Sequence, residues 1–251
     1  MSQRDEVEQR VQTFYDNDGW QLDGTEETHD ENYFGDNRAI RAAYNEGLKN
    51  SFARLFPEGG EVFLNAGCGS FKENALRCTA LFDRIDCVDI SKQALALSER
   101  KLGEKGRYIL SSLIDLELPD NCADGTLCAH VIYHIYRSEQ EKAVRSLIRV
   151  TKPGKPIVIN YSNPRSPSNL MERVYRGLRI NRIAGGQKFY FHAHPLSWWR
   201  RFEDSCELEY LPYSVLSGAQ SRMLVPNNSL GERFYQWAAR LEKERSALAV
   251  R

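Results

Sequence analysis

The 251-residue chain has no long run of apolar residues and no excess of charge of either sign. No stretch approaches the roughly 18 consecutive apolar residues that a membrane-spanning helix needs. The first ten residues, MSQRDEVEQR, are charged where a secretory signal peptide is apolar, so we expect a cytoplasmic protein. Because 34 Lys and Arg residues balance 34 Asp and Glu residues, no whole-molecule field attracts nucleic acid or an anionic membrane.

Cysteine patterns typical of a zinc site are also missing. The 6 cysteines form no C-x-x-C pair, and none has a histidine at metal-ligand spacing. Cys68, Cys87, Cys122 and Cys128 stand in apolar stretches, where reduced cysteine behaves as a small buried hydrophobe. We therefore expect no structural metal.

The chain does contain enough apolar residues for a folded core, with 41% hydrophobic and 11% aromatic residues. Strand-like runs are found at residues 61–67, 84–91, 107–110, 125–133, 156–162, 206–216 and 221–226. Helical patterns are found at residues 74–81, 92–102, 139–150, 196–203 and 229–248. This alternation predicts an α/β fold: a doubly wound, mostly parallel seven-stranded sheet with helices on both faces.

Two regions depart from the alternation. Residues 1–56 are predicted to form an N-terminal helical arm or lid, and residues 57–251 the domain that carries the sheet. Residues 163–194 follow the fifth strand and are predicted to form an inserted cap. Such a cap lies over the edge where open sheets bind ligands.

Two glycines directly follow the first predicted strand. Val62–Ala66 runs into Gly67-Cys68-Gly69, where glycine lets the backbone come close to a ligand. Asp89 stands twenty residues after Gly69, at the end of the next strand, where a carboxylate can accept both ribose hydroxyls of a nucleoside. Strand, glycine turn, helix and acid at this spacing together predict a nucleoside site.

The class of nucleoside follows from what this turn lacks. A dinucleotide fingerprint has a third glycine three residues after the second, and this chain has Lys72 there. The phosphate-loop pattern G-x-x-x-x-G-K-[ST] is absent as well. These absences favour a nucleoside without a phosphate chain.

The glycine turn resembles the first motif of the class I, Rossmann-like S-adenosylmethionine-dependent methyltransferases, usually a strand ending in Asp-x-Gly-x-Gly. The likeness covers about residues 60–162, with further landmarks at 118–121 (LPDN), 129–134 (AHVIYH) and 149–154 (RVTKPG). It implies a methyltransferase whose cofactor is S-adenosyl-L-methionine.

The resemblance also implies cofactor contacts at the carboxyl ends of the first four strands. The residues are Asn65, Ala66, Gly67, Gly69, Asp89, Ile90, Ser112, Leu113 and His130. Asp89 is expected to bind the ribose, Ile90 and the Ser112-Leu113 turn to pack on adenine, and His130 to lie beside the methionine moiety.

Two positions depart from the family: Asn65 replaces the usual acid of the first motif, and Ser112 replaces an acid near adenine unless Asp115 is its true equivalent. We expect weakened rather than lost cofactor binding, because asparagine can still orient the turn.

For the chemistry, methyl transfer depends mainly on positioning, and a base is needed only for some acceptors. His134 follows the fourth strand on the ligand-binding side and is the first candidate base for a hydroxyl acceptor. The alternative is a buried imidazole bonded to a carbonyl group.

Acceptor contacts are expected from the arm, the cap and the end of the fourth strand. The candidates are Tyr15, Tyr33, Tyr133, Arg165, His192 and His194. The two histidines are two residues apart, but the sequence shows no third ligand, so no metal site is predicted. The cap also carries basic residues, namely Arg173, Arg176, Arg179, Arg182 and Lys188. They suit an anionic acceptor or, alternatively, pair with the acidic segment 16–36.

We therefore expect direct methyl transfer, first of all to oxygen, on a small-molecule, sugar or glycan acceptor. One alternative is a non-catalytic S-adenosylmethionine-binding partner or sensor protein, which the departures at Asn65 and Ser112 favour. A second is an RNA methyltransferase, which predicts strongly salt-dependent association. No nucleic-acid partner and no membrane span are expected, and the sequence leaves the acceptor and the oligomeric state open.

Overall fold

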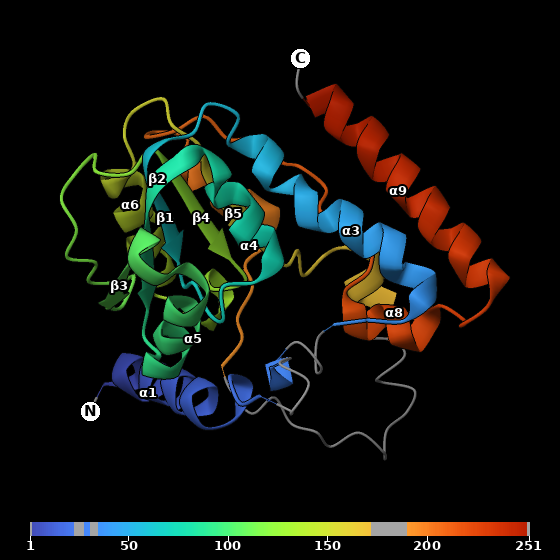
Figure 1. The fold of residues 1–251 in the computed structure, drawn as a ribbon, viewed down its shortest axis with the longest axis horizontal. Coiled ribbons are helices and arrows are strands. Elements are labelled where there is room, and N and C mark those ends of the chain that lie inside the picture. The colour runs from blue at the N-terminus through green and yellow to red at the C-terminus, as the bar shows by residue number, and fades with distance from the viewer. Residues whose placement is uncertain (1, 23–27, 31–34, 172–189, 250–251) are drawn as a thin grey trace.

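A parallel sheet forms the centre of the protein in a computed structural model that describes residues 2–22, 28–30, 35–171 and 190–249 (Figure 1). Within these residues the strands are β1 (Gly60–Ala66), β2 (Phe82–Asp89), β3 (Gly106–Leu110), β4 (Gly125–Ala129) and β5 (Ile157–Asn160). Their order is β3-β2-β1-β4-β5, and every pair is parallel. The winding reverses between β1 and β4, and a ligand crevice is expected at the carboxyl ends of these two strands.

Helices cover both faces of the sheet and extend beyond it. The helices of the alternating part are α4 (Glu73–Cys78), α5 (Lys92–Leu102) and α6 (Gln140–Val150). The others are α1 (Gln3–Phe14), α3 (Ala42–Ser51), α8 (Gly218–Leu224) and α9 (Ser229–Ala249). Shorter turns include η1 (Tyr15–Gly19), η6 (Ile132–His134) and η7 (Leu196–Phe202). In Figure 1, α3 and α9 lie side by side, away from the sheet.

The core has two layers because successive residues of a strand point to opposite faces of the sheet. Phe63 and Leu127 pack with residues of α4 and α5, whereas Leu64 and Cys128 pack with residues of α6 and η7. All four side chains are completely buried. Both faces are therefore covered, which explains why the strands are continuous apolar runs.

The predicted α/β fold with a parallel sheet is confirmed, but the prediction of seven strands is wrong for the described part of the chain, which has five. Residues 206–216 are irregular, and one of their backbone groups bonds to a side chain instead of a strand: the N–H of Val215 donates to Oε1 of Glu242 (2.9 Å). Residues 221–226 lie mostly in α8. Ser217 and Gln220 form a reciprocal capping box at 3.2 and 3.0 Å, which favours a helix where the apolar run indicated a strand.

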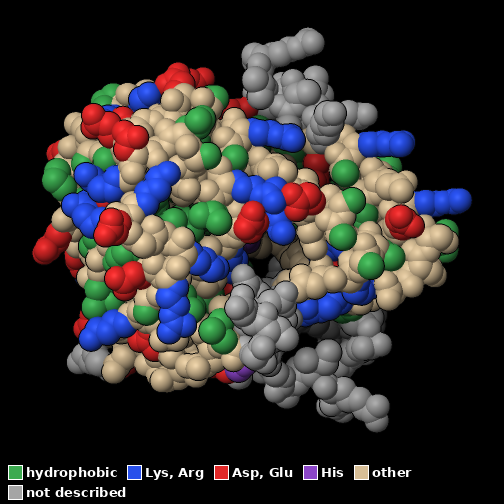
Figure 2. All heavy atoms as spheres, viewed as in Figure 1, with side chains coloured by type: hydrophobic (Ala, Val, Ile, Leu, Met, Phe, Trp, Pro, Cys, Tyr) green, Lys and Arg blue, Asp and Glu red, His purple; other side chains and the backbone are tan. Residues whose placement is uncertain are grey.

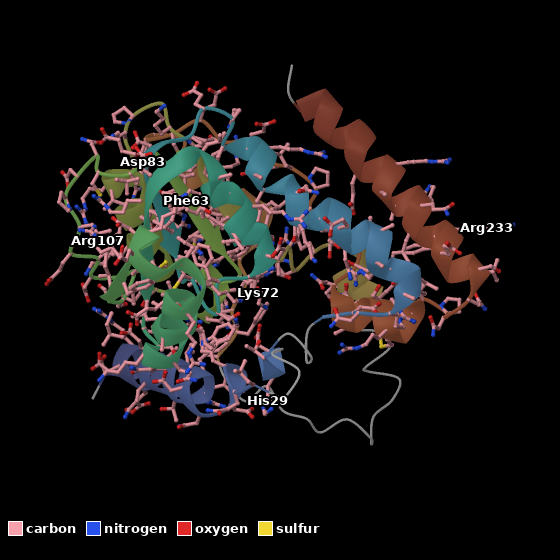
Figure 3. All side chains as sticks on the ribbon, in the orientation of Figure 1. His29, Phe63, Lys72, Asp83, Arg107 and Arg233 are labelled. Carbon is pink, nitrogen blue, oxygen red and sulfur yellow. The ribbon has the colours of Figure 1, made fainter. Side chains whose placement is uncertain are left out.

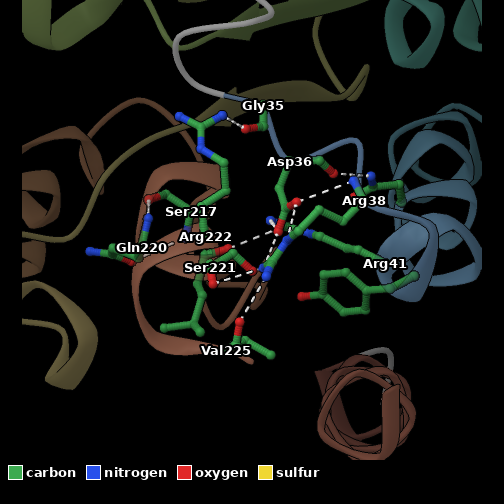
Figure 4. Close-up of polar contacts among 12 residues, drawn as sticks. Gly35, Asp36, Arg38, Arg41, Ser217, Gln220, Ser221, Arg222 and Val225 are labelled. Carbon is green, nitrogen blue, oxygen red and sulfur yellow. Dashed lines mark hydrogen bonds and ion pairs between the residues drawn. The ribbon is translucent and has the colours of Figure 1, made fainter. Parts of the chain in front are cut away.

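A buried carboxylate joins the segment before α3 to α8 and α9 (Figure 4). Asp36 accepts hydrogen bonds from Nε and Nη2 of Arg38, both at 2.8 Å. Arg38 also donates to the backbone oxygens of Ser221 (2.9 Å) and Val225 (2.8 Å), and the hydroxyl of Tyr235 donates to Asp36 (3.2 Å). Burial alone would raise the pKa of Asp36, but the hydrogen bonds from Arg38 bring it below its ordinary value. Asp36 is therefore ionised and holds three elements together.

Replacing Asp36 by asparagine should lower the free energy of unfolding by about 3–5 kcal/mol, because Arg38 and Arg41 lose their buried counter-charge. Urea unfolding at neutral pH measures the change. The matched control is Asp83→Asn at the exposed start of β2 (Figure 3), which should change stability by less than about 0.5 kcal/mol. Equal stability of the two variants would show that Asp36 does not hold these elements.

Candidate functional site

A cleft of about 2040 Å³ lies at the carboxyl ends of the strands. It begins at the glycine turn after β1, passes the ends of β4 and β5, and continues to α3, α8 and α9. Figure 2 shows the surface hollowed near the middle of the molecule. The crevice expected from the strand order is therefore present and extends well beyond the sheet.

The carboxylate of Asp89 points toward the glycine turn. Its Oδ2 accepts a hydrogen bond from the N–H of Gly69 (2.9 Å), and its Oδ1 accepts one from the N–H of Ser91 (2.9 Å). Burial raises the pKa of Asp89 to about 6, although these hydrogen bonds oppose the shift. An acceptor group is thus held at the point where a ribose is expected.

The turn itself requires both glycines. Gly67 and Gly69 have φ angles of 70° and 56°, which L side chains rarely adopt. A Cβ on Gly67 would lie 2.2 Å from Cγ2 of Val131, and one on Gly69 would lie 2.8 Å from Cη2 of Trp20. The space that a Cβ would occupy at these two glycines is therefore taken by the side chains of Val131 and Trp20.

Helix α1 crosses the loops that follow β2 and β3. Four polar residues contact these loops: three of α1 and one of η1, each four residues after the one before it. The pairs are Arg4 with Asp115, Glu8 with Ser112, Gln12 with the backbone of Ile90, and Asp16 with Ser91. The hydrogen bonds of Glu8, Gln12 and Asp16 measure 2.9, 2.8 and 2.5 Å. Sequence analysis missed this contact face, although the spacing of four is visible in the sequence.

Two aromatic residues after α1 cover the glycine turn. Tyr15 and Trp20 stack with ring centroids 4.9 Å apart, and Trp20 packs against Gly69 and against Ala94 of α5. The ring of Tyr15 also lies 6.2 Å from that of His134. The arm therefore reaches from the glycine turn to the predicted base.

The end of β4 carries two neutral histidines. Nε2 of His130 accepts from the amide of Asn160 (3.1 Å), so its Nδ1 carries the proton and donates to the hydroxyl of Tyr133 (2.7 Å). Nδ1 of His134 donates to the carbonyl oxygen of Tyr190 (2.8 Å), which makes Nε2 the basic nitrogen. Burial lowers the pKa of both imidazoles to about 4. His134 thus shows the carbonyl-bonded geometry of the structural alternative while it also lines the cleft.

An ion pair that the sequence analysis did not single out faces these histidines. Nζ of Lys72 lies 2.7 Å from Oδ2 of Asp30, and both residues line the cleft. Figure 3 shows Lys72 near the middle of the molecule. The charge of Asp30 favours the protonated forms of His130 and His134, although burial outweighs this effect. The cleft therefore places a carboxylate and an ammonium group beside the predicted base.

Most of the predicted site residues line the cleft together. They are Asn65, Gly67, Gly69, Asp89, Ile90, Ser112, Leu113, His130, Tyr133, His134 and Tyr15. Asp115 does not line the cleft and instead pairs with Arg4 and Lys142 on the surface, whereas Ser112 lines the cleft.

Four other predicted residues lie apart from the cleft. Ala66 is in the core, and Arg165 is exposed outside the cleft lining. The backbone N–H of His192 donates to the carbonyl oxygen of Tyr133 in η6 (2.7 Å), and the ring of His194 stacks on Trp198 of η7 at 4.5 Å. Further candidates fall outside the described residues, namely Tyr33, Arg173, Arg176, Arg179, Arg182 and Lys188.

The described part of the chain offers neither a metal site nor a helix that could span a membrane. No group of three or more His, Cys, Asp or Glu side chains is arranged to hold a metal ion. No described helix is both long and apolar enough to cross a membrane.

Comparisons with known proteins agree with this geometry. Residues 64–159 match a family described as a methyltransferase domain. The ubiquinone/menaquinone biosynthesis C-methyltransferase of Yersinia pestis is 29% identical over 123 residues, which cover 47% of this chain and 39% of that protein. The match thus spans well under half of that relative's length. Magnesium protoporphyrin IX methyltransferase of Synechocystis PCC 6803 has a similar fold, with a TM-score of 0.54 and 15% identity over 79% of this chain and 88% of the other.

The fold and the site define a Rossmann-like protein with a crevice at the switch point of its sheet, where the carboxylate of Asp89 meets a glycine turn. Residues 64–159 match a methyltransferase domain, and this match supports the resemblance to the class I S-adenosylmethionine-dependent methyltransferases. The cofactor of this family is S-adenosylmethionine, and the carboxylate and glycine turn described above fit its ribose.

The pKa of Asp89 predicts how cofactor binding depends on pH. The ionised carboxylate is a much stronger acceptor for ribose hydroxyls than the protonated acid, so affinity for S-adenosylhomocysteine should be constant above about pH 7 and fall by up to about tenfold per unit below about pH 6. Calorimetric titration from about pH 5 to about pH 8 measures this slope, because the charges of the ligand itself are constant there. Asp89→Asn should weaken binding and remove the slope; a slope that persists in this variant would assign it to another group.

The contacts of α1 predict its effect on ligand release. Removing two hydrogen bonds with Glu8→Ala and Gln12→Ala should speed dissociation of S-adenosylhomocysteine about tenfold. Glu6→Ala with Gln9→Ala, on the exposed face of the same helix, is the matched control. Stopped-flow displacement measures both rates, and equal rates would mean that α1 does not retain the ligand.

Proposed function

We propose that the chain transfers the methyl group of S-adenosylmethionine to an oxygen atom of a small-molecule acceptor. The observation that carries this proposal is that one cleft joins the Asp89–Gly69 turn to the buried histidines at the end of β4. The first group suits a nucleoside, and the second offers a proton acceptor. The match to a methyltransferase family covers the strands that carry both.

In this proposal the cofactor contacts follow the order of the strands. Asp89 binds the ribose, Ile90 with Ser112 and Leu113 packs on adenine, and His130 lies beside the methionine moiety. Asn65, Gly67 and Gly69 shape the turn, while Ala66 supports it from the core. When bound, the cofactor supplies an electrophilic methyl group on a positively charged sulfur.

His134 is the proposed base. Methylation of a hydroxyl group releases one proton, which Nε2 of His134 accepts while the carbonyl of Tyr190 holds the ring through Nδ1. With a pKa of about 4 the imidazole is unprotonated from about pH 6 to about pH 9, so it is available but weakly basic. Most of the acceleration then comes from positioning.

The arm and the cap complete the proposal. Residues 1–56 act as a lid on a domain of residues 57–251, and Tyr15 with Tyr133 contacts the acceptor and excludes water. No role is assigned to Tyr33, which lies outside the described residues, or to Arg165, His192 and His194, which lie apart from the cleft. No anionic or glycan acceptor is proposed either, because most of the cap's basic residues lie outside the described residues.

The first experiment is calorimetric titration with S-adenosylmethionine and S-adenosylhomocysteine, followed by incubation of methyl-labelled cofactor with cell extract and mass spectrometry of the labelled product. Binding and a labelled small molecule are expected. Binding of both ligands without any labelled product would favour a sensor protein. Labelled RNA, with association that weakens steeply with salt, would favour RNA methylation.

On the labelled product, His134→Ala should lower kcat by about 10²–10⁴ if the ring removes the proton. The affinity for S-adenosylhomocysteine and the thermal unfolding temperature, measured on the same sample, show whether the variant is folded. The wild-type rate should show no histidine titration between about pH 6 and about pH 9, because the pKa of His134 is about 4. Unchanged turnover of the variant in this range would leave His134 with a structural role only.

A further inference from the structure

Helix α9 contributes two aromatic side chains to the cleft. Phe234 and Trp237 both line it, with ring centroids 5.8 Å apart and planes at 43°. Trp237 is 52% exposed although it is one of the largest apolar side chains. An exposed apolar surface of this kind in a cleft is typical of a ligand site.

The rotation of α9 about its own axis is set by other residues. Tyr235 and Ala238 are 3% and 1% exposed and pack into a cluster with Tyr44. The hydroxyl of Tyr235 donates to Asp36, and the hydroxyl of Tyr44 donates to Glu242 (2.5 Å). Because these contacts fix which side of the helix is buried, residues 234 and 237, three apart, present a neighbouring face to the cleft.

Five aliphatic side chains of the same part of the protein also line the cleft. They are Leu48 of α3, Leu216, Leu224 and Val225 in and beside α8, and Leu241 of α9. We call these five residues with Phe234 and Trp237 the helical compartment. Of the charged groups next to it, Asp36 is bonded to Arg38, Glu242 to Tyr44 and Val215, and Lys49 is paired with Glu46, whereas Arg41 keeps two buried nitrogens without a hydrogen bond. The seven side chains of the compartment itself offer apolar contact.

The helical compartment is continuous with the reaction site. Asn160 and Asn163, at and after the end of β5, line the cleft, and so do Asn169 and Gln220, which are hydrogen-bonded at 2.8 Å. The cleft volume of about 2040 Å³ exceeds the roughly 300–1,000 Å³ of a site for one small ligand. The cleft thus has room for a cofactor and for a sizeable second molecule.

We infer that the helical compartment binds an apolar, non-reacting part of the methyl acceptor, a hydrocarbon or aromatic group of several carbon atoms. This inference rests on the proposed function and adds the acceptor's chemical class to it. A sugar in the same place would bury hydroxyl groups against aliphatic side chains without partners, which is unfavourable. An apolar group instead covers Trp237 and gains from the loss of its own hydration.

The test uses 4-propylphenol, 4-butylphenol and 4-pentylphenol, titrated calorimetrically into the full chain saturated with S-adenosylhomocysteine. In the wild type, affinity should rise about two- to fourfold with each added methylene. Trp237→Gln should flatten this series and weaken 4-pentylphenol at least about fivefold. The half-exposed position of Trp237 makes loss of folding an unimportant risk, and unchanged affinity for S-adenosylhomocysteine checks it.

Leu230→Gln is the matched control, because Leu230 is 64% exposed on the same helix and does not line the cleft. It should keep the wild-type series, and maltose should not bind. The inference is overturned if Trp237→Gln keeps the chain-length dependence, if the control loses it equally, or if maltose binds as tightly as 4-pentylphenol. S-adenosylhomocysteine binding without any alkylphenol binding overturns this inference alone, whereas failure to bind S-adenosylhomocysteine overturns the proposed function as well.

Discussion

The hydrogen bond from the N–H of Gly69 to the carboxylate of Asp89 is the interaction on which the site depends. It joins the turn after β1 to the end of β2 at the edge where the sheet changes winding direction. The bond requires a positive φ at Gly69, and burial of the carboxylate raises its pKa to about 6. The same carboxylate therefore shapes the turn and becomes partly protonated at mildly acidic pH.

The acidic arm is an integral part of this site. Asp16 bonds to Ser91 at the start of α5, and Asp30 pairs with Lys72 beside the histidines of β4. Between them, Tyr15 and Trp20 stack over the glycine turn. The acidic segment, which also contains aromatic residues, thus supplies a helix contact, an ion pair and, together with Tyr15, an apolar cover at three separate points.

The second structural centre is the carboxylate of Asp36, which holds α8 and α9 to the segment before α3. Its position decides the rotation of α9 and so brings Phe234 and Trp237 to the cleft. The sheet end of the cleft carries the carboxylate of Asp89 and the two histidines, whereas the helical end carries the apolar residues of the helical compartment. In the proposed reaction, the first end would orient the reacting atoms, and the second would discriminate among acceptors.

Local patterns in the sequence determined the parallel sheet, the glycine turn and the position of Asp89, because strand alternation and turn chemistry depend on neighbouring residues. The two extra predicted strands were wrong because the Ser217–Gln220 capping box and the side chain of Glu242 bind backbone groups that a strand would need. Only the tertiary structure decided the pairing of Asp30 with Lys72 and the tautomer of His134, whose partners lie 42 and 56 residues away. Such contacts arise from the packing of distant elements, and no local periodicity encodes them.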